Sequence, residues 1–160
     1  MKNNELAKES FRLANNDYTS AKFLFNNLRP MPIEIICYLS QQAVEKAIKT
    51  VLYYTDKDVP KTHSIIELLD AVNADKKRIQ LSKKDASRIT MFATRTRYAD
   101  RRIDVTEEDA ELGLRYAKQI LDQVSQILRI EKEQNAEIAE DDLTQDDDYQ
   151  IGDDDWENKI

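Results

Sequence analysis

Apolar residues recur along most of this chain at the spacing of an α-helix. From Phe11 to Leu28 they are separated by three and four residues in turn, which gathers them into one stripe and predicts a helix over about residues 5–28. The prolines that follow end this helix, because each lacks a backbone donor. A second apolar face begins at Ile33 and continues to about Tyr54. So short a connection favours antiparallel packing of the two helices.

Three further helices are expected in the second half of the chain. Ser64 and Glu67 have the spacing of a capping box, in which the hydroxyl accepts from an open backbone N–H and the carboxylate reaches back. Similar helix starts occur at Ser82 and Thr106, and the last helix is expected to fade near residue 130. With only two glycines and three prolines, the chain lacks the turn formers of a β-fold. We therefore expect an all-α, up-and-down bundle of about five helices over residues 5–131.

Charge is distributed unevenly between this bundle and the end of the chain. Residues 132–160 carry 12 acidic residues and two lysines, a net charge of −10, so the whole-chain value of −7 leaves about +3 for the rest. Because this tail has few apolar residues to bury, we expect it to be disordered. Its apolar residues interrupt the acidic runs, so the tail is either a solubilising segment or one that docks on a partner; they are Leu143, Tyr149, Ile151 and Trp156.

Several classes of chemistry are disfavoured by the residues present. The single cysteine, Cys37, lies in an apolar run and is expected to be a buried thiol. His63 is the only histidine, so a converging zinc site is not expected, and no glycine-rich loop is present to hold a phosphate. We expect no metal and no cofactor. No apolar run is long enough to span a membrane or to form a secretion signal, so we expect a cytoplasmic protein.

An arginine-rich segment is the strongest candidate for ligand binding. It contains Arg95, Arg97, Tyr98, Arg101 and Arg102 within eight residues. Guanidinium groups match phosphate oxygens bidentately, and a tyrosine ring can stack on a base. The structural alternative is that Arg97 pairs internally with an acid such as Asp100 or Glu45 while the other arginines are solvated.

Three other polar residues are candidate contributors to the same site. Gln42 and Lys46 are one helical turn apart and can share a face. His63 lies just before a helix start, where it either caps that helix or contributes to catalysis.

The order and spacing of four segments resemble the HEPN family, the higher eukaryotes and prokaryotes nucleotide-binding domain. The matching segments are Ala21-Lys22-Phe23-Leu24, Gln41-Gln42-Ala43-Val44-Glu45-Lys46-Ala47-Ile48-Lys49, Lys61-Thr62-His63-Ser64-Ile65 and Arg97-Tyr98-Ala99-Asp100, which together span about residues 7–130. The resemblance implies a homodimer in which the arginine-bearing helix end lies near its symmetry mate. It also implies kinship with proteins paired with a nucleotidyltransferase, in toxin–antitoxin or defence systems.

Many members of that family are ribonucleases in which a histidine follows an arginine by a few residues. No histidine follows the arginines here, and arginine stays protonated at the pH where RNA cleavage needs a proton acceptor. The resemblance therefore implies a binder of a nucleotide or RNA phosphate with no catalytic residue, through a set of seven residues: Arg95, Arg97, Tyr98, Asp100, Lys46, Gln42 and His63. Two alternatives stay open, an atypical metal-independent ribonuclease using His63 and Arg95, and a protein-interaction module regulated by the acidic tail.

Overall fold

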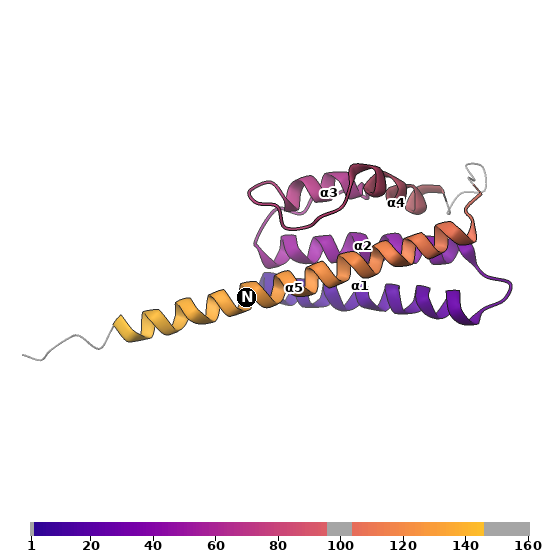
Figure 1. The fold of residues 1–160 in the computed structure, drawn as a ribbon. Coiled ribbons are helices and arrows are strands. Elements are labelled where there is room, and N and C mark those ends of the chain that lie inside the picture. The colour runs from indigo at the N-terminus through magenta and orange to yellow at the C-terminus, as the bar shows by residue number, and fades with distance from the viewer. Residues whose placement is uncertain (1, 96–103, 146–160) are drawn as a thin grey trace, which may run out of the picture. The chain divides into compact units, whose positions relative to one another are not determined.

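Five α-helices occupy the part of the chain that the computed structural model describes, residues 2–95 and 104–145 (Figure 1). They are α1 (Lys2–Asn27), α2 (Ile33–Tyr54), α3 (Ile65–Val72), α4 (Lys83–Arg95) and α5 (Glu107–Gln145). No strand occurs among these residues, so the all-α bundle predicted from the sequence is confirmed. Side chains are described within residues 3–93 and 104–129.

The first two helices pack against each other. Figure 1 shows α1 and α2 lying side by side and antiparallel, as the short connection predicts. Ala7, Ala14 and Ala21 recur every seven residues on α1 and are all buried. Because alanine adds little volume beyond the backbone, this stripe lets α1 approach α2 closely.

The remaining helices cover α2 from other sides. α3 and α4 contact each other and both contact α2, over which they lie in Figure 1. The buried face of α5 includes Ala117, Ile120 and Val124, which join the main hydrophobic cluster. α2 therefore lies at the centre of the bundle, and 12 of its residues are buried.

Hydroxyl side chains begin three of the helices, at Ser64, Ser82 and Thr106, as the sequence predicts. Thr106 Oγ1 accepts from the backbone N–H of Asp109 at 3.2 Å while Asp109 accepts from the N–H of Thr106 at 3.0 Å, a complete capping box. Ser64 Oγ likewise accepts from the N–H of Glu67. The predicted return bond from Glu67 is wrong, because the N–H of Ser64 donates to Thr62 Oγ1 at 3.0 Å.

Two helix bounds differ from those expected. α1 begins at Lys2, three residues before the start expected at residue 5. α5 continues to Gln145, well past residue 131, because residues 131–145 are rich in Glu, Ala, Gln and Lys and contain neither glycine nor proline. The disorder expected for residues 132–160 is wrong for residues 132–145, which are helical, and residues 146–160 lie outside the described residues.

Candidate functional site

Polar side chains interrupt the otherwise apolar buried face of α2. Gln41 is fully buried and Glu45, one turn later, is nearly so. A buried carboxylate is strongly unfavourable unless hydrogen bonds or opposite charges compensate it. Whether Glu45 can stay ionised therefore depends on the groups that contact it.

Three side chains from two segments hold Glu45. Lys49 Nζ donates to Oε1 at 2.7 Å and Gln41 Nε2 donates to Oε2 at 2.9 Å, both from α2. His63, from the loop before α3, places Nδ1 at 3.1 Å from Oε2. Burial alone would raise the pKa of Glu45, but the hydrogen bonds from Lys49, Gln41 and His63 outweigh it and leave that pKa below its ordinary value. Glu45 is therefore ionised at neutral pH.

The ionised carboxylate fixes the orientation of the His63 ring. An ionised carboxylate only accepts hydrogen bonds, so Nδ1 of His63 must carry the hydrogen that it shares with Glu45. The His63 side chain is 66% exposed while that of Glu45 is 6% exposed. One ring nitrogen is thus held by the protein interior, and Nε2 has no hydrogen bond within residues 3–93 and 104–129.

The loop that carries His63 is also bonded to α4. The backbone N–H of Ile65 donates to Thr90 Oγ1 at 3.0 Å, and Thr90 Oγ1 in turn donates to the carbonyl of Ala86. Thr90 lies five residues before Arg95, the last residue of α4, which is about 7.5 Å along a helix axis. The helix that leads into the arginine-rich segment is therefore the one that anchors the His63 loop.

Gln42 and Lys46, the two predicted site residues on α2, have different partners. Gln42 joins the network, because its Nε2 donates to Gln41 Oε1 at 2.8 Å. Lys46 does not, because its ammonium pairs with Asp17 on α1 at 2.5 Å and its carbonyl accepts from Ser10. The ammonium of Lys46 thus forms an ion pair that links α2 to α1.

The arginine-rich segment itself is only partly described. Arg95 ends α4, and its side chain is not among those described. Arg97, Tyr98 and Asp100 lie outside the described residues. Whether these residues lie beside His63 therefore stays a prediction.

The sequence alone does not reveal the central position of Glu45 in this network. In the sequence, Glu45 is one of two acids that could pair with Arg97, whereas in the structure it is the residue to which His63, Gln41 and Lys49 all bond. Gln41, Glu45 and Lys49 recur every four residues, which puts three polar side chains on one stripe of a largely buried helix. That stripe is the feature of the sequence that indicates a buried polar network on this helix.

Other reactive groups have simpler roles. Burial raises the pKa of the Cys37 thiol to about 12, so it stays protonated, as expected of a core cysteine. Within residues 3–93 and 104–129, no three His, Cys, Asp or Glu side chains converge as a metal site would require. Among the described helices, none is both long and apolar enough to cross a membrane.

Comparison with known proteins places this network within a recognised domain. The model of the HEPN domain family matches residues 7–128, most of the chain. The chain belongs to the HEPN domain family. Comparison with curated proteins gave no significant match. Among solved structures, the HEPN chain is similar to TT1696 from Thermus thermophilus, with a TM-score of 0.62 and 24% identity over 75% of this chain and 96% of that one.

The HEPN match covers every residue of the Glu45 network. Gln41, Gln42, Glu45, Lys49 and His63 all lie between residues 7 and 128. The likeness to TT1696 at this identity supports the fold alone. The chemistry of this HEPN chain therefore depends on its own side chains.

Proposed function

We propose that this HEPN protein binds a nucleotide or an RNA phosphate at the corner of the bundle formed by the His63 loop and the end of α4. The observation that carries the proposal is the contact between Glu45 and His63, which uses Nδ1 of an imidazole whose side chain is mostly exposed and leaves Nε2 without a hydrogen bond among the described residues. Arg95, Arg97 and Tyr98 supply the phosphate and base contacts, with Asp100 beside them in the sequence. Gln42 and His63 complete the site.

Chemistry supports a phosphate as the ligand. Guanidinium groups donate in pairs to phosphate oxygens, and an imidazole held by a carboxylate can donate a charge-assisted hydrogen bond to the same group. Membership of the HEPN family supports this class of ligand as well. Lys46 has no part in this version of the site, because Asp17 neutralises it.

The assembly follows from the same kinship. We propose a homodimer in which two copies bring their arginine-bearing helix ends together, and a nucleotidyltransferase as the partner protein of a toxin–antitoxin or defence pair. These parts of the proposal are supported by the family resemblance and not by contacts within one chain.

A ribonuclease activity is the second candidate, and the Glu45–His63 pair is what favours it. In this version, Nε2 of His63 takes the proton from a 2′-hydroxyl, whose oxygen attacks the adjacent phosphorus. The 5′-oxygen then leaves with a proton from solvent, giving a 2′,3′-cyclic phosphate and a 5′-hydroxyl. Arg95 would stabilise the charge on the phosphate oxygens. Glu45 would act as a positioning residue that holds the imidazole.

The test of binding is the thermal stability of the purified protein with each common nucleotide and with a short RNA. A ligand at a hundred times its Kd adds about 2.7 kcal/mol to the free energy of unfolding, which raises Tm measurably. The rise should disappear in Arg97→Ala and shrink in His63→Ala. Arg12→Ala is the matched control, because Arg12 is an exposed arginine on α1 paired with Glu9. No rise with any nucleotide or RNA would overturn the proposal.

Cleavage of RNA separates the two candidates. Loss of cleavage in both His63→Ala and Arg95→Ala, with normal activity in Arg12→Ala, would establish the ribonuclease. Binding without cleavage would leave the protein as a phosphate binder.

A further inference from the structure

A groove between α1 and α5 lies apart from the Glu45 network. It has a volume of about 580 Å³, and α1 contributes Tyr18, Lys22, Phe25 and Asn26 to its walls. From α5 come five more residues: Leu114, Arg115, Lys118, Gln119 and Asp122. None of these residues belongs to the proposed phosphate site.

The floor of the groove is apolar and partly aromatic. Tyr18, Phe25 and Leu114 are half-buried and pack against the two core clusters. Each therefore keeps part of its apolar surface accessible. An occupant with an aromatic or aliphatic side chain would remove that surface from water.

The rim of the groove is cationic. Its walls hold three cations and one carboxylate, and Lys118 donates to that carboxylate, Asp122, at 2.6 Å. Arg115 has a single weak partner among the described residues, Glu111 at 3.9 Å, and its side chain is 68% exposed. Lys22 is exposed and has no hydrogen bond or ion pair within residues 3–93 and 104–129. Two cations are thus available to an acidic occupant.

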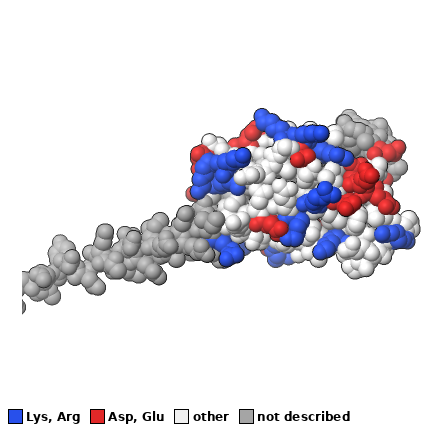
Figure 2. Space-filling view, viewed as in Figure 1, with Lys and Arg blue, Asp and Glu red and all other residues white. Residues whose placement is uncertain are grey.

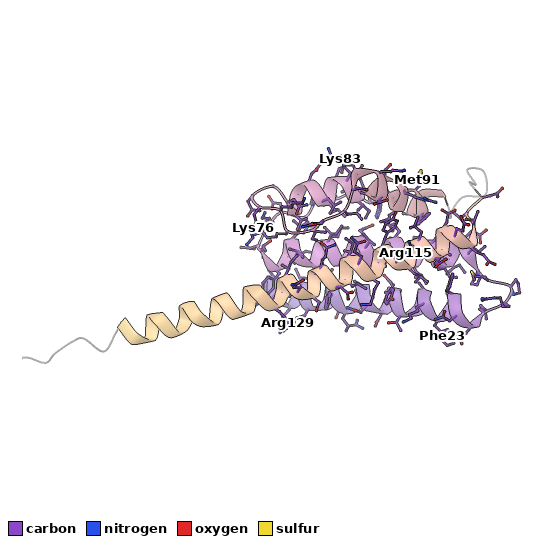
Figure 3. All side chains as sticks on the ribbon, in the orientation of Figure 1. Phe23, Lys76, Lys83, Met91, Arg115 and Arg129 are labelled. Atoms are coloured by element: carbon purple, nitrogen blue, oxygen red, sulfur yellow. The ribbon has the colours of Figure 1, made fainter. Side chains whose placement is uncertain are left out.

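Figure 2 shows Lys and Arg side chains, interspersed with Asp and Glu, on one face of the bundle. Figure 3 labels Arg115 on α5, in the part of that helix that belongs to the bundle. An apolar strip bordered by positive charge is suited to an acidic segment with apolar anchors.

The chain itself contains a segment of that composition. Residues 146–156 read Asp-Asp-Asp-Tyr-Gln-Ile-Gly-Asp-Asp-Asp-Trp, in which six aspartates surround Tyr149, Ile151 and Trp156. The aspartates match the cationic rim, and the aromatic and aliphatic residues match the apolar floor. Since every copy has both the groove and the segment, two copies can exchange them reciprocally around a two-fold axis.

We propose that the α1–α5 groove binds residues 146–156 of a second copy of this chain. Lys22 and Arg115 receive the aspartates, and the floor receives an aromatic side chain of the segment. This contact is independent of the phosphate site and gives the acidic tail a defined partner.

Trp156 provides a direct probe, because it is the only tryptophan in the chain. In the full-length protein, its emission should shift to shorter wavelength and be protected from iodide quenching. Dilution and added salt should both remove the protection, because the contact is intermolecular and electrostatic. Lys22→Glu with Arg115→Glu should remove it at every concentration. Lys8→Glu with Arg12→Glu is the control, because it makes the same change of charge at two exposed positions of α1 outside the groove.

Mixing two full-length variants tests the exchange itself. One chain has Lys22→Glu and Arg115→Glu, so its groove is disabled and its Trp156 is intact. The other has Trp156→Phe, so its groove is intact and it contributes no tryptophan signal. Adding the second chain in excess should restore protection of the first chain's Trp156. Adding a chain that has all three substitutions should not. Circular dichroism and Tm establish that each variant is folded.

Three results would overturn the proposal. Trp156 that is quenched as freely in the native protein as in urea would mean that the segment is not bound. Protection that resists dilution and is not restored by mixing would mean that each chain binds its own tail. Loss of oligonucleotide binding in the groove variant, with Trp156 exposed throughout, would assign the groove to nucleic acid.

Discussion

Glu45 bonds to three side chains of the bundle, and their hydrogen bonds keep it charged. Lys49 and Gln41 approach from the same helix, and His63 approaches from a loop 18 residues further along the chain. Gln42 extends the chain of hydrogen bonds through Gln41. At this scale the site is a buried carboxylate that is held by Lys49 and Gln41 and that orients the ring of His63.

Replacing Glu45 tests this arrangement. Glu45→Gln keeps the shape but removes the charge that Lys49 and His63 face, so the free energy of unfolding should fall by about 1–3 kcal/mol in urea denaturation at neutral pH. Glu9→Gln, an exposed glutamate on α1, is the control and should change stability little.

The pH dependence of this difference has a defined sign. Because the folded-state pKa of Glu45 lies below its ordinary value of 4.5, the carboxylate contributes stability above that pH and loses it as pH falls through the folded-state pKa. The gap between wild type and Glu45→Gln should therefore be full at neutral pH and shrink below about pH 4.5. A gap that stays constant down to the acid transition would mean that Glu45 is not ionised in the folded protein.

At the scale of the helices, two contacts hold the site in position. Thr90 links the start of α3 to α4, and Gly113 lets α5 approach α2. Neither residue contacts the exposed nitrogen of His63. Substitutions of Thr90 and Gly113 therefore test how the site is held in place without changing the groups proposed to bind the ligand.

Thr90→Val should loosen the His63 loop without altering any ligand-binding group. The N–H of Ile65 loses its acceptor, which lowers the free energy of unfolding by about 1–3 kcal/mol. Nucleotide or RNA affinity, measured by calorimetry, should fall as well because the loop is less well placed. Thr19→Val, an exposed position on α1, is the control. Affinity equal to that of wild type would show that the α4 anchor does not matter for binding.

Gly113→Ala tests the close approach of α5 to α2. A methyl group there would lie 3.1 Å from Cβ of Ser40 and 3.4 Å from the ring of Phe92. Since Cβ of Ser40 moves only with its backbone, overpacking of about 1–3 kcal/mol should exceed the roughly 1 kcal/mol that alanine contributes to helix propensity. Chemical denaturation should show a net loss that Ser40→Gly partly reverses. A more stable Gly113→Ala protein would mean that the two helices can separate at little cost.

At the scale of the whole molecule, the sequence predicts the helices better than it predicts their polar contacts. Local signals suffice for an element such as α2, whose observed bounds are those expected, and for the capping pair of Thr106 and Asp109. The pairing of Lys46 with Asp17 joins residues 29 positions apart, and no local pattern reveals it. Burial of Glu45 likewise depends on a partner from a separate loop.

Charge segregation is the other property of the whole chain. Residues 146–160 include seven acidic residues and one lysine, a net charge of −6, whereas residues 1–145 have a net charge of only −1. Removing residues 146–160 should strengthen binding of a polyanion such as RNA by about tenfold at low ionic strength, with the difference fading at high salt. Filter binding at several salt concentrations measures this effect. Equal affinity at low salt would show that the tail does not compete with polyanions.

The single histidine makes the central claim directly measurable. A heteronuclear NMR spectrum of the imidazole region contains one histidine signal, and titration with a nucleotide or a short RNA reports on His63 alone. We predict a saturable shift of the His63 ring resonances, which is absent in Arg97→Ala and retained in Arg12→Ala. Saturable binding that leaves these resonances unmoved would contradict the assignment of the phosphate site to His63 and the end of α4.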